Sequence, residues 1–197
     1  TIGTALRRSL LSSLYGAAVT GVQIEGVFHE FSTLQGVVED TVDIMLNIKE
    51  LCLKMHVDHA KTLEIHANGE GEITGGSIEH DADVEILNPD LHIATLNKEG
   101  RLDAQLIAKT GRGYAPAERN REEGQPVQLI PIDALFSPVR KVNFKVENTR
   151  VQQATDFDKL MIEVWTDGSV GPEDAVAQAA KLIKDHLQVF INFEEEP

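Results

Sequence analysis

The opening residues Thr1-Ile-Gly-Thr-Ala-Leu-Arg-Arg-Ser-Leu-Leu-Ser-Ser-Leu14 predict an amphipathic helix, because their apolar spacing is that of a helix with a buried face. On a helical wheel, one arc holds four leucines: Leu6, Leu10, Leu11 and Leu14. Arg7 falls inside that arc, so we expect this helix to pack against neighbours on two sides. Arg8 lies on the polar side in a stretch without acids, which makes it a candidate contact for an acidic or carbonyl-rich partner surface.

Downstream of this helix the sequence alternates between strand and helix patterns. Val22 and Ile24 alternate with polar residues and predict a strand, with Gly16 and Gly26 as its breaks. In residues 37–51 the apolar side chains of Val38, Val42, Met45 and Leu46 recur at spacings of three and four, with acids near the amino end, which predicts a short amphipathic helix. Residues 53–106 consist of short alternating runs between turn residues, the first of them with Leu53, Met55 and Val57, which predicts a mostly antiparallel sheet.

The second half of the chain returns to a helix after further strands. Residues 115–126 are almost devoid of apolar side chains and predict a mobile loop, and strands resume over 127–135, 142–146 and 160–164. Pro172, followed by two acids, predicts the start of a long final helix. That helix has two neighbouring apolar stripes, the first made of Val176, Ala179, Ala180, Ile183, Leu187 and Phe190, and the second of Leu182, His186 and Val189. A helix that is apolar on two flanks predicts contact with its own sheet on one side and with a second copy of the chain on the other.

The amino-acid composition argues against a nucleic-acid-binding protein and against a membrane protein. The 197 residues carry 18 basic and 32 acidic side chains, a net charge of −14, which disfavours direct binding to a nucleic-acid backbone. Cys52 is the one cysteine and lies in an apolar run, so we expect a reduced, buried thiol and an intracellular protein. The sequence has no long apolar run and no signal-peptide pattern at its start, which favours a soluble cytoplasmic protein without a membrane span.

The same residues resemble a known family. Gly3, Leu6 to Arg8 and Leu10 to Ser13, followed by Val27-Phe-His-Glu-Phe-Ser-Thr33, are similar to the amino-terminal domain of bacterial RNA polymerase alpha subunits. The likeness continues in order along nearly the whole chain, through Glu39-Asp40, Asn47-Ile-Lys49, Gly111-Arg-Gly-Tyr114, Ser137-Pro-Val139, Asn148-Thr-Arg-Val151 and Asp156-Phe-Asp-Lys-Leu160. We expect the chain to be trimmed relative to that family, whose first strand precedes the opening helix and whose DNA-binding domain follows a linker.

This resemblance implies an α+β fold with two subdomains. A discontinuous dimerisation subdomain would comprise residues 1–14 and 139–197, and a mainly antiparallel β subdomain, residues 15–138, would be inserted into it. The implied function is a non-catalytic assembly scaffold that homodimerises and recruits the beta and beta-prime subunits, with no cofactor and no metal. Together with the helical stripes it gives these dimer-interface residues: Leu6, Leu10, Leu14, Val176, Ala179, Ala180, Ile183, Leu187 and Phe190.

Two groups of residues match the family's contacts with the large subunits. The first group is Arg8, Leu11, Asp43 and Lys49. The second group is Ile132, Asp133, Glu147, Arg150 and Lys159. The division of these contacts between beta and beta-prime stays open.

Two other functions remain as alternatives. His56 and His59, with His66 and His80 nearby, could form the zinc site of a free-standing metal-dependent hydrolase. On a strand, however, His56 and Asp58 share a face while His59 points away, so we interpret these histidines as exposed polar residues. A homodimeric adaptor outside transcription would show the same two-helix pattern, because a scaffold has no reaction signature.

Overall fold

The computed structural model describes residues 1–28, 31–121, 124–151 and 154–191, with the backbone alone at 150, 151 and 154–156. The chain folds into two compact units. Unit 1 consists of Thr1–Leu14 and Ser137–Pro197, and unit 2 of Tyr15–Phe136. The fold class is α+β, as predicted, with antiparallel sheets and few helices. The second boundary between the units lies at 136/137, two residues before the predicted 138/139.

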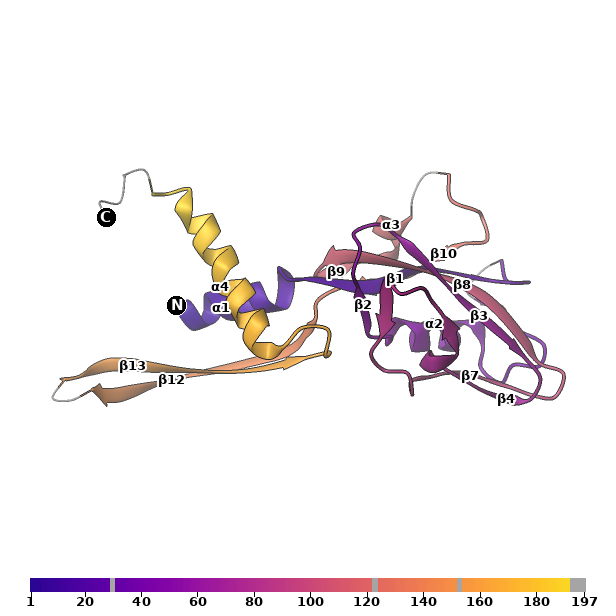
Figure 1. The fold of residues 1–197 in the computed structure, drawn as a ribbon, viewed down its shortest axis with the longest axis horizontal. Helices are drawn as coiled ribbons and strands as arrows, with labels where there is room; N and C mark the ends of the chain where they lie inside the picture. Colours follow the sequence, from indigo (N-terminus) through magenta and orange to yellow (C-terminus); the bar gives the residue numbers. More distant parts are fainter. Residues whose placement is uncertain (29–30, 122–123, 152–153, 192–197) are drawn as a thin grey trace. The chain divides into compact units, whose positions relative to one another are not determined.

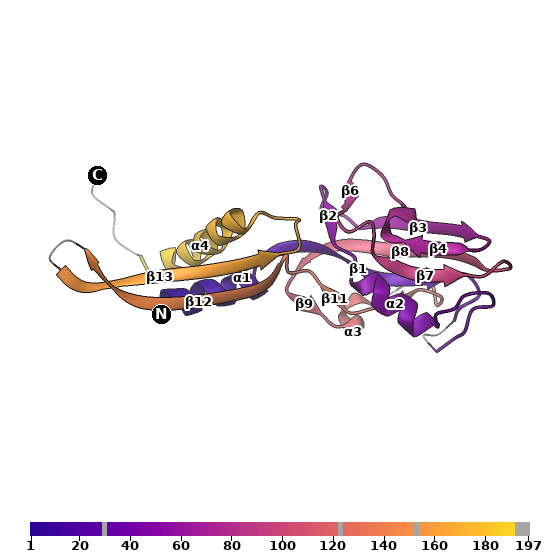
Figure 2. The same ribbon diagram turned by 90° about the horizontal axis from the view of Figure 1, so that it is seen from below.

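Unit 1 is a long β-hairpin with two helices on one face (Figure 2). Strands β12 (Val139–Val151) and β13 (Ala154–Thr166) pair antiparallel, so that Val142 lies opposite Val164 and Val146 opposite Leu160. Helix α1 (Ile2–Ser12) packs on β12 and on α4 (Pro172–Gln188), which begins at the predicted proline. The core between helices and hairpin contains Leu10, Leu14, Val139, Val142, Ala175 and Ala179.

Unit 2 is built on a seven-stranded antiparallel sheet in the order β5-β3-β8-β1-β2-β6, with β10 paired to β1. Its strands are β1 (Tyr15–Ile24), β2 (Leu53–Met55), β3 (Lys61–Asn68), β5 (Ile78–Glu79), β6 (Val84–Ile86), β8 (Arg101–Arg112) and β10 (Ile130–Pro131). Two smaller ribbons pair β4 (Gly71–Thr74) with β7 (His92–Leu96), and β9 (Tyr114–Ala115) with β11 (Ala134–Leu135). The remaining elements are α2 (Thr41–Lys49), a 3-10 turn, η1 (Gly75–Ser77), and α3 (Ala117–Asn120).

The core of unit 2 lies between the large sheet and a layer formed by α2 and the β4–β7 ribbon (Figure 1). Strand β8 alternates strictly, with Leu102, Ala104, Leu106 and Ala108 buried, because successive side chains of a strand point to opposite faces. Helix α2 contributes Ile44 and Ile48 to this core. Its start is fixed by Asp40, whose carboxylate accepts the backbone N–H of Asp43 at 2.8 Å, as an N-cap residue does.

The loop before α2 is held to the end of the β7–β8 turn by a close backbone approach. Gly36 has a φ of 82°, which favours glycine, and its carbonyl oxygen accepts the N–H of Asn97 at 2.9 Å. A Cβ added to Gly100 would overlap that same carbonyl oxygen. Two glycines thus allow the loop leading to α2 to lie against the β7–β8 turn.

Several local predictions need correction. Gly16 does not break the first strand, because it lies within β1 and pairs with Gly111. Strand β2 ends at Met55, where its pairing with β6 ends, so residues 56–59 form a bend instead of continuing a strand. The predicted loop at 115–126 contains helix α3. In the described part of the chain, no helix is long and apolar enough to cross a membrane.

Candidate functional site

The structure divides the first apolar stripe predicted for α4 between core and surface. Ala179 is buried in the core of unit 1 together with Ala175, and Leu182 of the second predicted stripe packs against that core. Ala180 is exposed, Ile183 is half-buried and Leu187 is 56% exposed, and we call these three residues the exposed stripe of α4. A surface helix normally shows polar residues on the side away from its own core. The exposed stripe of α4 is therefore a candidate interface.

The residues predicted for the dimer interface divide between core and surface. Leu10, Leu14 and Ala179 are buried inside unit 1 itself, and Leu6 and Val176 pack against the same core. Three members are exposed: Ala180, Leu187 and Phe190. Phe190 lies two residues beyond the last residue of α4 and is 82% exposed. The exposed members can meet a partner directly, whereas the buried ones position the two helices.

Helix α1 presents its polar side to solvent. Arg8 is exposed, and its carbonyl oxygen accepts the hydroxyl of Ser12 at 2.7 Å. Leu11 is half-buried and packs against the core of unit 1. Of these two predicted contacts, Arg8 is thus the freer side chain for recognition of a partner.

In unit 2, Lys49 and Asp133 form an ion pair with an N–O distance of 3.0 Å. Asp133 also accepts the backbone N–H of Ala117 at 3.0 Å. The hydrogen bond from Lys49, with that from Ala117, lowers the pKa of Asp133 below its usual range. Ile132, next to Asp133 in the chain, is buried. Asp43, on the same helix as Lys49, is exposed.

An apolar groove of about 300 Å³ lies beside the Lys49–Asp133 pair. Phe31, which is 78% exposed, and Leu46 of α2 line it, together with Val42, Met45, Pro131 and Ile132. The apolar repeat predicted for residues 37–51 included Val42 and Leu46, but the buried face of α2 is Thr41, Ile44, Met45 and Ile48. Phe31 and Leu46 were not among the predicted contacts, although large apolar side chains on an exposed surface indicate an interaction site.

The remaining predicted contacts lie on the hairpin of unit 1. Glu147 of β12 is the cross-strand partner of Lys159 of β13 and accepts a hydrogen bond from Lys145 at 2.6 Å. Arg150 belongs to β12, but its side chain lies outside the described residues. Glu147 and Lys159 therefore belong to one unit, and Ile132 and Asp133 to the other.

The histidines considered for a metal site do not converge. His56 and His59 are exposed in the bend after β2, and His80 follows β5. His66 lies between Asp103, at 2.8 Å, and Glu64, at 3.3 Å. Within the described ranges, no three His, Cys, Asp or Glu side chains are grouped so that they could hold a metal ion.

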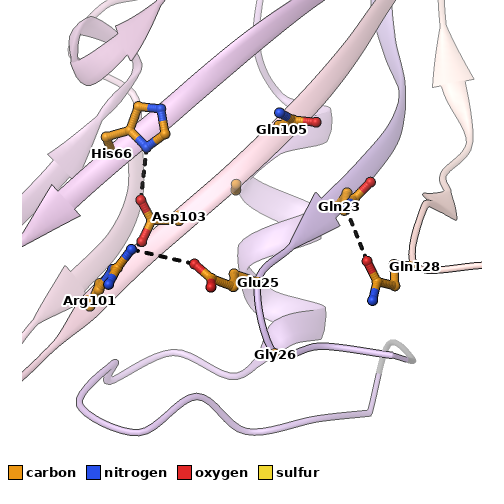
Figure 3. Close-up of a pocket in the computed structure, with 9 residues that line it drawn as sticks. Gln23, Glu25, Gly26, His66, Arg101, Asp103, Gln105 and Gln128 are labelled. Atoms are coloured by element: carbon orange, nitrogen blue, oxygen red, sulfur yellow. Dashed lines mark hydrogen bonds and ion pairs between the residues drawn. The ribbon is translucent and has the colours of Figure 1, made fainter. Parts of the chain in front are cut away.

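A polar cleft of about 520 Å³ lies on the outer face of the large sheet, around His66 (Figure 3). Arg101 lies between Asp103, to which its Nε donates, and Glu25, 3.5 Å from its guanidinium. Gln23 donates to Gln128 at 3.3 Å across the cleft. The hydrogen bonds with Asp103 and then Glu64 raise the pKa of His66. The charged groups that line the cleft thus pair with one another across three strands. This pairing stabilises a sheet face that is open to solvent.

His92 joins the segment before α2 to the β4–β7 ribbon. Its Nε2 lies 2.8 Å from Glu39 and its Nδ1 2.7 Å from Glu72. An ionised carboxylate only accepts hydrogen bonds, so the two contacts can both be hydrogen bonds only when the ring is protonated. The bond to Glu39, followed by that to Glu72, raises the pKa of His92.

Glu39 is tied to β7 by further bonds. Its carboxylate accepts the N–H of Thr95 at 2.6 Å and the Thr95 hydroxyl at 3.0 Å. Burial by itself raises the pKa of Glu39, but the bonds from Thr95 and His92 outweigh it, so this pKa lies below its usual value. The cluster therefore anchors the approach to α2, one wall of the apolar groove.

Comparisons with a family model and with curated proteins all indicate RNA polymerase alpha subunits. Residues 22–137 match the family model described as the RNA polymerase Rpb3/RpoA insert domain. The chain is 58% identical, over 196 residues, to the DNA-directed RNA polymerase subunit alpha of Symbiobacterium thermophilum, covering 100% of this chain and 62% of that protein. It is 57% identical over 195 residues to the corresponding subunit of Moorella thermoacetica, covering 99% of this chain and 62% of the relative. The chain thus spans about three fifths of the length of these curated relatives.

Proposed function

The chain belongs to the family of bacterial DNA-directed RNA polymerase alpha subunits, and on that premise we propose that it is a non-catalytic assembly scaffold of the polymerase. It homodimerises through α1 and α4 of unit 1 and then recruits the beta and beta-prime subunits in the cytoplasm. Residues 1–14 and 139–197 would serve dimerisation, and the inserted residues 15–138 would add surface for the large subunits.

The exposed apolar stripe of α4 is the observation that supports dimerisation. Leu187 is exposed on a helix whose neighbouring stripe, with Ala175 and Ala179, is already buried in unit 1. Small residues such as Ala180 on the exposed stripe allow a second helix to approach closely. Because the same stripe exists on every copy, a two-fold symmetric contact buries both stripes at once.

Leu187→Glu tests this interface. Loss of a partly buried leucine and burial of a charge together cost roughly 2 kcal/mol in each copy, and therefore about a thousandfold in dimer affinity. Light scattering during size-exclusion chromatography should show a dimer for the unchanged chain and a monomer for the variant. Lys181→Glu is the matched control, because it places the same new carboxylate on an exposed position of α4 outside the stripe. A fully dimeric Leu187→Glu variant would contradict the proposal.

Recruitment of the large subunits is supported by the surfaces on both units. Arg8 is exposed on α1, and unit 2 offers Asp43, the Lys49–Asp133 pair and the adjoining apolar groove. We expect Arg8→Ala to keep the dimer mass but to weaken capture of a bacterial beta subunit. The measurement is co-elution of the variant with purified beta subunit, with Lys181→Glu again as control. If Arg8→Ala binds as the unchanged chain does, Arg8 is not a contact.

A further inference from the structure

The segment that leads into α2 carries part of the apolar groove and is held by the start of that helix. We name residues 31–40 the lead segment. The Ser32 carbonyl oxygen accepts the backbone N–H of Thr41 at 3.2 Å and also the Thr41 hydroxyl. The neighbouring Phe31 ring lines the groove together with Leu46 of α2. The position of this ring therefore depends on how the lead segment is attached.

Strand β7 holds the other end of the lead segment. Val38 donates its N–H to the carbonyl oxygen of Thr95 at 3.0 Å. The Glu39 carboxylate accepts the N–H and the hydroxyl of Thr95 and lies 2.8 Å from Nε2 of His92, and we name these contacts the Glu39 anchor. Glu39 lies two residues before Thr41, the first residue of α2. A change at the Glu39 anchor therefore acts on both the lead segment and the start of α2.

His92 is the group of this anchor that titrates near neutral pH. Its ring lies between Glu39, at 2.8 Å, and Glu72 of β4, at 2.7 Å. In the described part of the chain, these two carboxylates are the charged groups that face the ring. The nearby Asp40 carboxylate instead accepts the N–H of Asp43 at the start of α2. The three groups together carry one net negative charge when the ring is protonated and two when it is neutral.

Loss of the proton weakens the hold on Glu39. A neutral imidazole has one N–H, and its other nitrogen is an acceptor that repels a carboxylate. Glu72 is exposed and regains hydrogen bonds from water when the ring releases it, whereas the Glu39 side chain is only 16% exposed. Even a ring that keeps its bond to Glu39 then replaces a charged donor by a neutral one, which is about half as strong. The neutral ring therefore loosens the lead segment.

We propose that protonation of His92 and binding of a large polymerase subunit in the apolar groove favour each other through the lead segment. This inference rests on the proposed recruitment function and specifies how that surface is regulated. The coupling is reciprocal, because a proton that favours binding is itself favoured by binding to the same extent. Since both ion pairs are partly exposed to solvent, we expect about a threefold difference in affinity between the protonated and the neutral ring.

The direction of the pH effect follows from the environment of the ring. The hydrogen bond to Glu39, followed by that to Glu72, raises the pKa of His92. The ring is therefore fully protonated below the unfolded pKa of about 6.5 and loses its proton as the pH rises through the folded pKa. Binding in the groove should be tightest in mildly acidic solution and weaken as the pH rises.

Isothermal titration calorimetry measures both sides of the coupling. The unchanged chain and His92→Gln are titrated with a mixture of purified bacterial beta and beta-prime subunits at about pH 6 and about pH 9, at constant ionic strength. We expect the Kd of the unchanged chain to rise about threefold more than that of His92→Gln over this range. Buffers with different ionisation enthalpies should also show that the unchanged chain takes up more protons on binding. Titration of the large subunits themselves is common to both chains and cancels in the comparison.

His66→Gln is the matched control. His66 also lies between two carboxylates, Asp103 and Glu64, but on the outer face of the large sheet and not in the groove (Figure 3). This variant should keep the full pH effect of the unchanged chain. If circular dichroism shows that His92→Gln does not fold, Glu72→Gln takes its place. It removes one of the two charges that hold the proton, so it should move the pH effect to lower pH.

The outcomes separate this inference from the proposed function. Binding with the same pH dependence in the unchanged chain and in His92→Gln overturns the coupling and leaves recruitment intact. Loss of the pH effect in His66→Gln as well overturns the specific role of His92, because the effect would then belong to unit 2 as a whole. A complete lack of binding by every chain at both pH values overturns recruitment, and this inference with it.

Discussion

His92 provides the sharpest test of the energetics of unit 2. His92→Gln removes the charge and the titration of the bridge between Glu39 and Glu72 while keeping one hydrogen-bond donor. A hydrogen bond to a charged group contributes about 1.5–3 kcal/mol when buried. Here the His92 side chain is 39% exposed and Glu72 is 60% exposed, so solvent screens much of this gain, whereas Glu39 is only 16% exposed. We expect a loss of about 1 kcal/mol near pH 6, or a fall of about 3 °C in Tm.

The pH dependence of this loss has a definite sign. Because the folded-state pKa of His92 is raised, its contribution is fully present below the unfolded pKa of about 6.5 and is lost as the pH rises through the folded pKa. The pKa of Glu39 is lowered, so its contribution is present above its unfolded value and is lost as the pH falls through the folded pKa. The destabilisation by His92→Gln should therefore be largest in mildly acidic solution and shrink as the pH rises.

Urea unfolding followed by circular dichroism measures this difference across the pH range, and the imidazole resonance of His92 gives its pKa directly. His56→Gln is the matched control, because His56 is exposed in the bend after β2. The control should change stability little. A His92→Gln penalty that grows with increasing pH, or that does not change at all between about pH 6 and pH 9, would refute the imidazolium bridge.

Three further predictions concern packing, the ion pair and metal. Gly100→Ala should destabilise unit 2 by about 2 kcal/mol in urea unfolding, because the new Cβ overlaps the carbonyl oxygen of Gly36, whereas Gly71→Ala, with open space around it, should be close to neutral. Lys49→Ala should cost no more than about 1 kcal/mol of stability, because both partners are a third exposed, yet weaken capture of a large polymerase subunit in co-elution; unchanged capture would remove the pair from the contact surface. Treatment with a chelator should leave Tm unchanged in calorimetry, because no metal-binding group of three ligands occurs among the described residues, and a marked fall in Tm would revive the hydrolase alternative.

Local sequence patterns predicted where helices and strands lie better than they predicted which residues each element contacts. The start of α4 at Pro172 was predicted correctly, but the first predicted stripe of this helix is divided between core and surface. The spacing of apolar residues fixes their angular positions around the helix. It does not show whether a given side of the helix contacts the core of the chain or solvent. The structure assigns Ala175 and Ala179 to the core and leaves Leu187 exposed, and this asymmetry carries the proposal of a dimer.

Two of the errors share one physical cause, which is that the ends of strands depend on their partners. Alternation suggested a strand through Val57, but β2 ends at Met55 because its pairing with β6 ends opposite Val84. In the same way, Gly16 continues β1 because Gly111 of β8 lies opposite it. Backbone pairing with a distant segment outweighs local propensity in a sheet.

Motif order along the chain indicates the family and its α+β class, and local spacing indicates most of the helices and strands. Which apolar residues stay in solvent, and which charges meet, depends on tertiary packing. Glu39 and His92 are 53 residues apart, and Lys49 and Asp133 are 84 apart, so no local pattern indicates either pair. Contacts at such separations form because the sheet brings distant segments together, and the exposed surface that a partner can use is what remains after the core has closed.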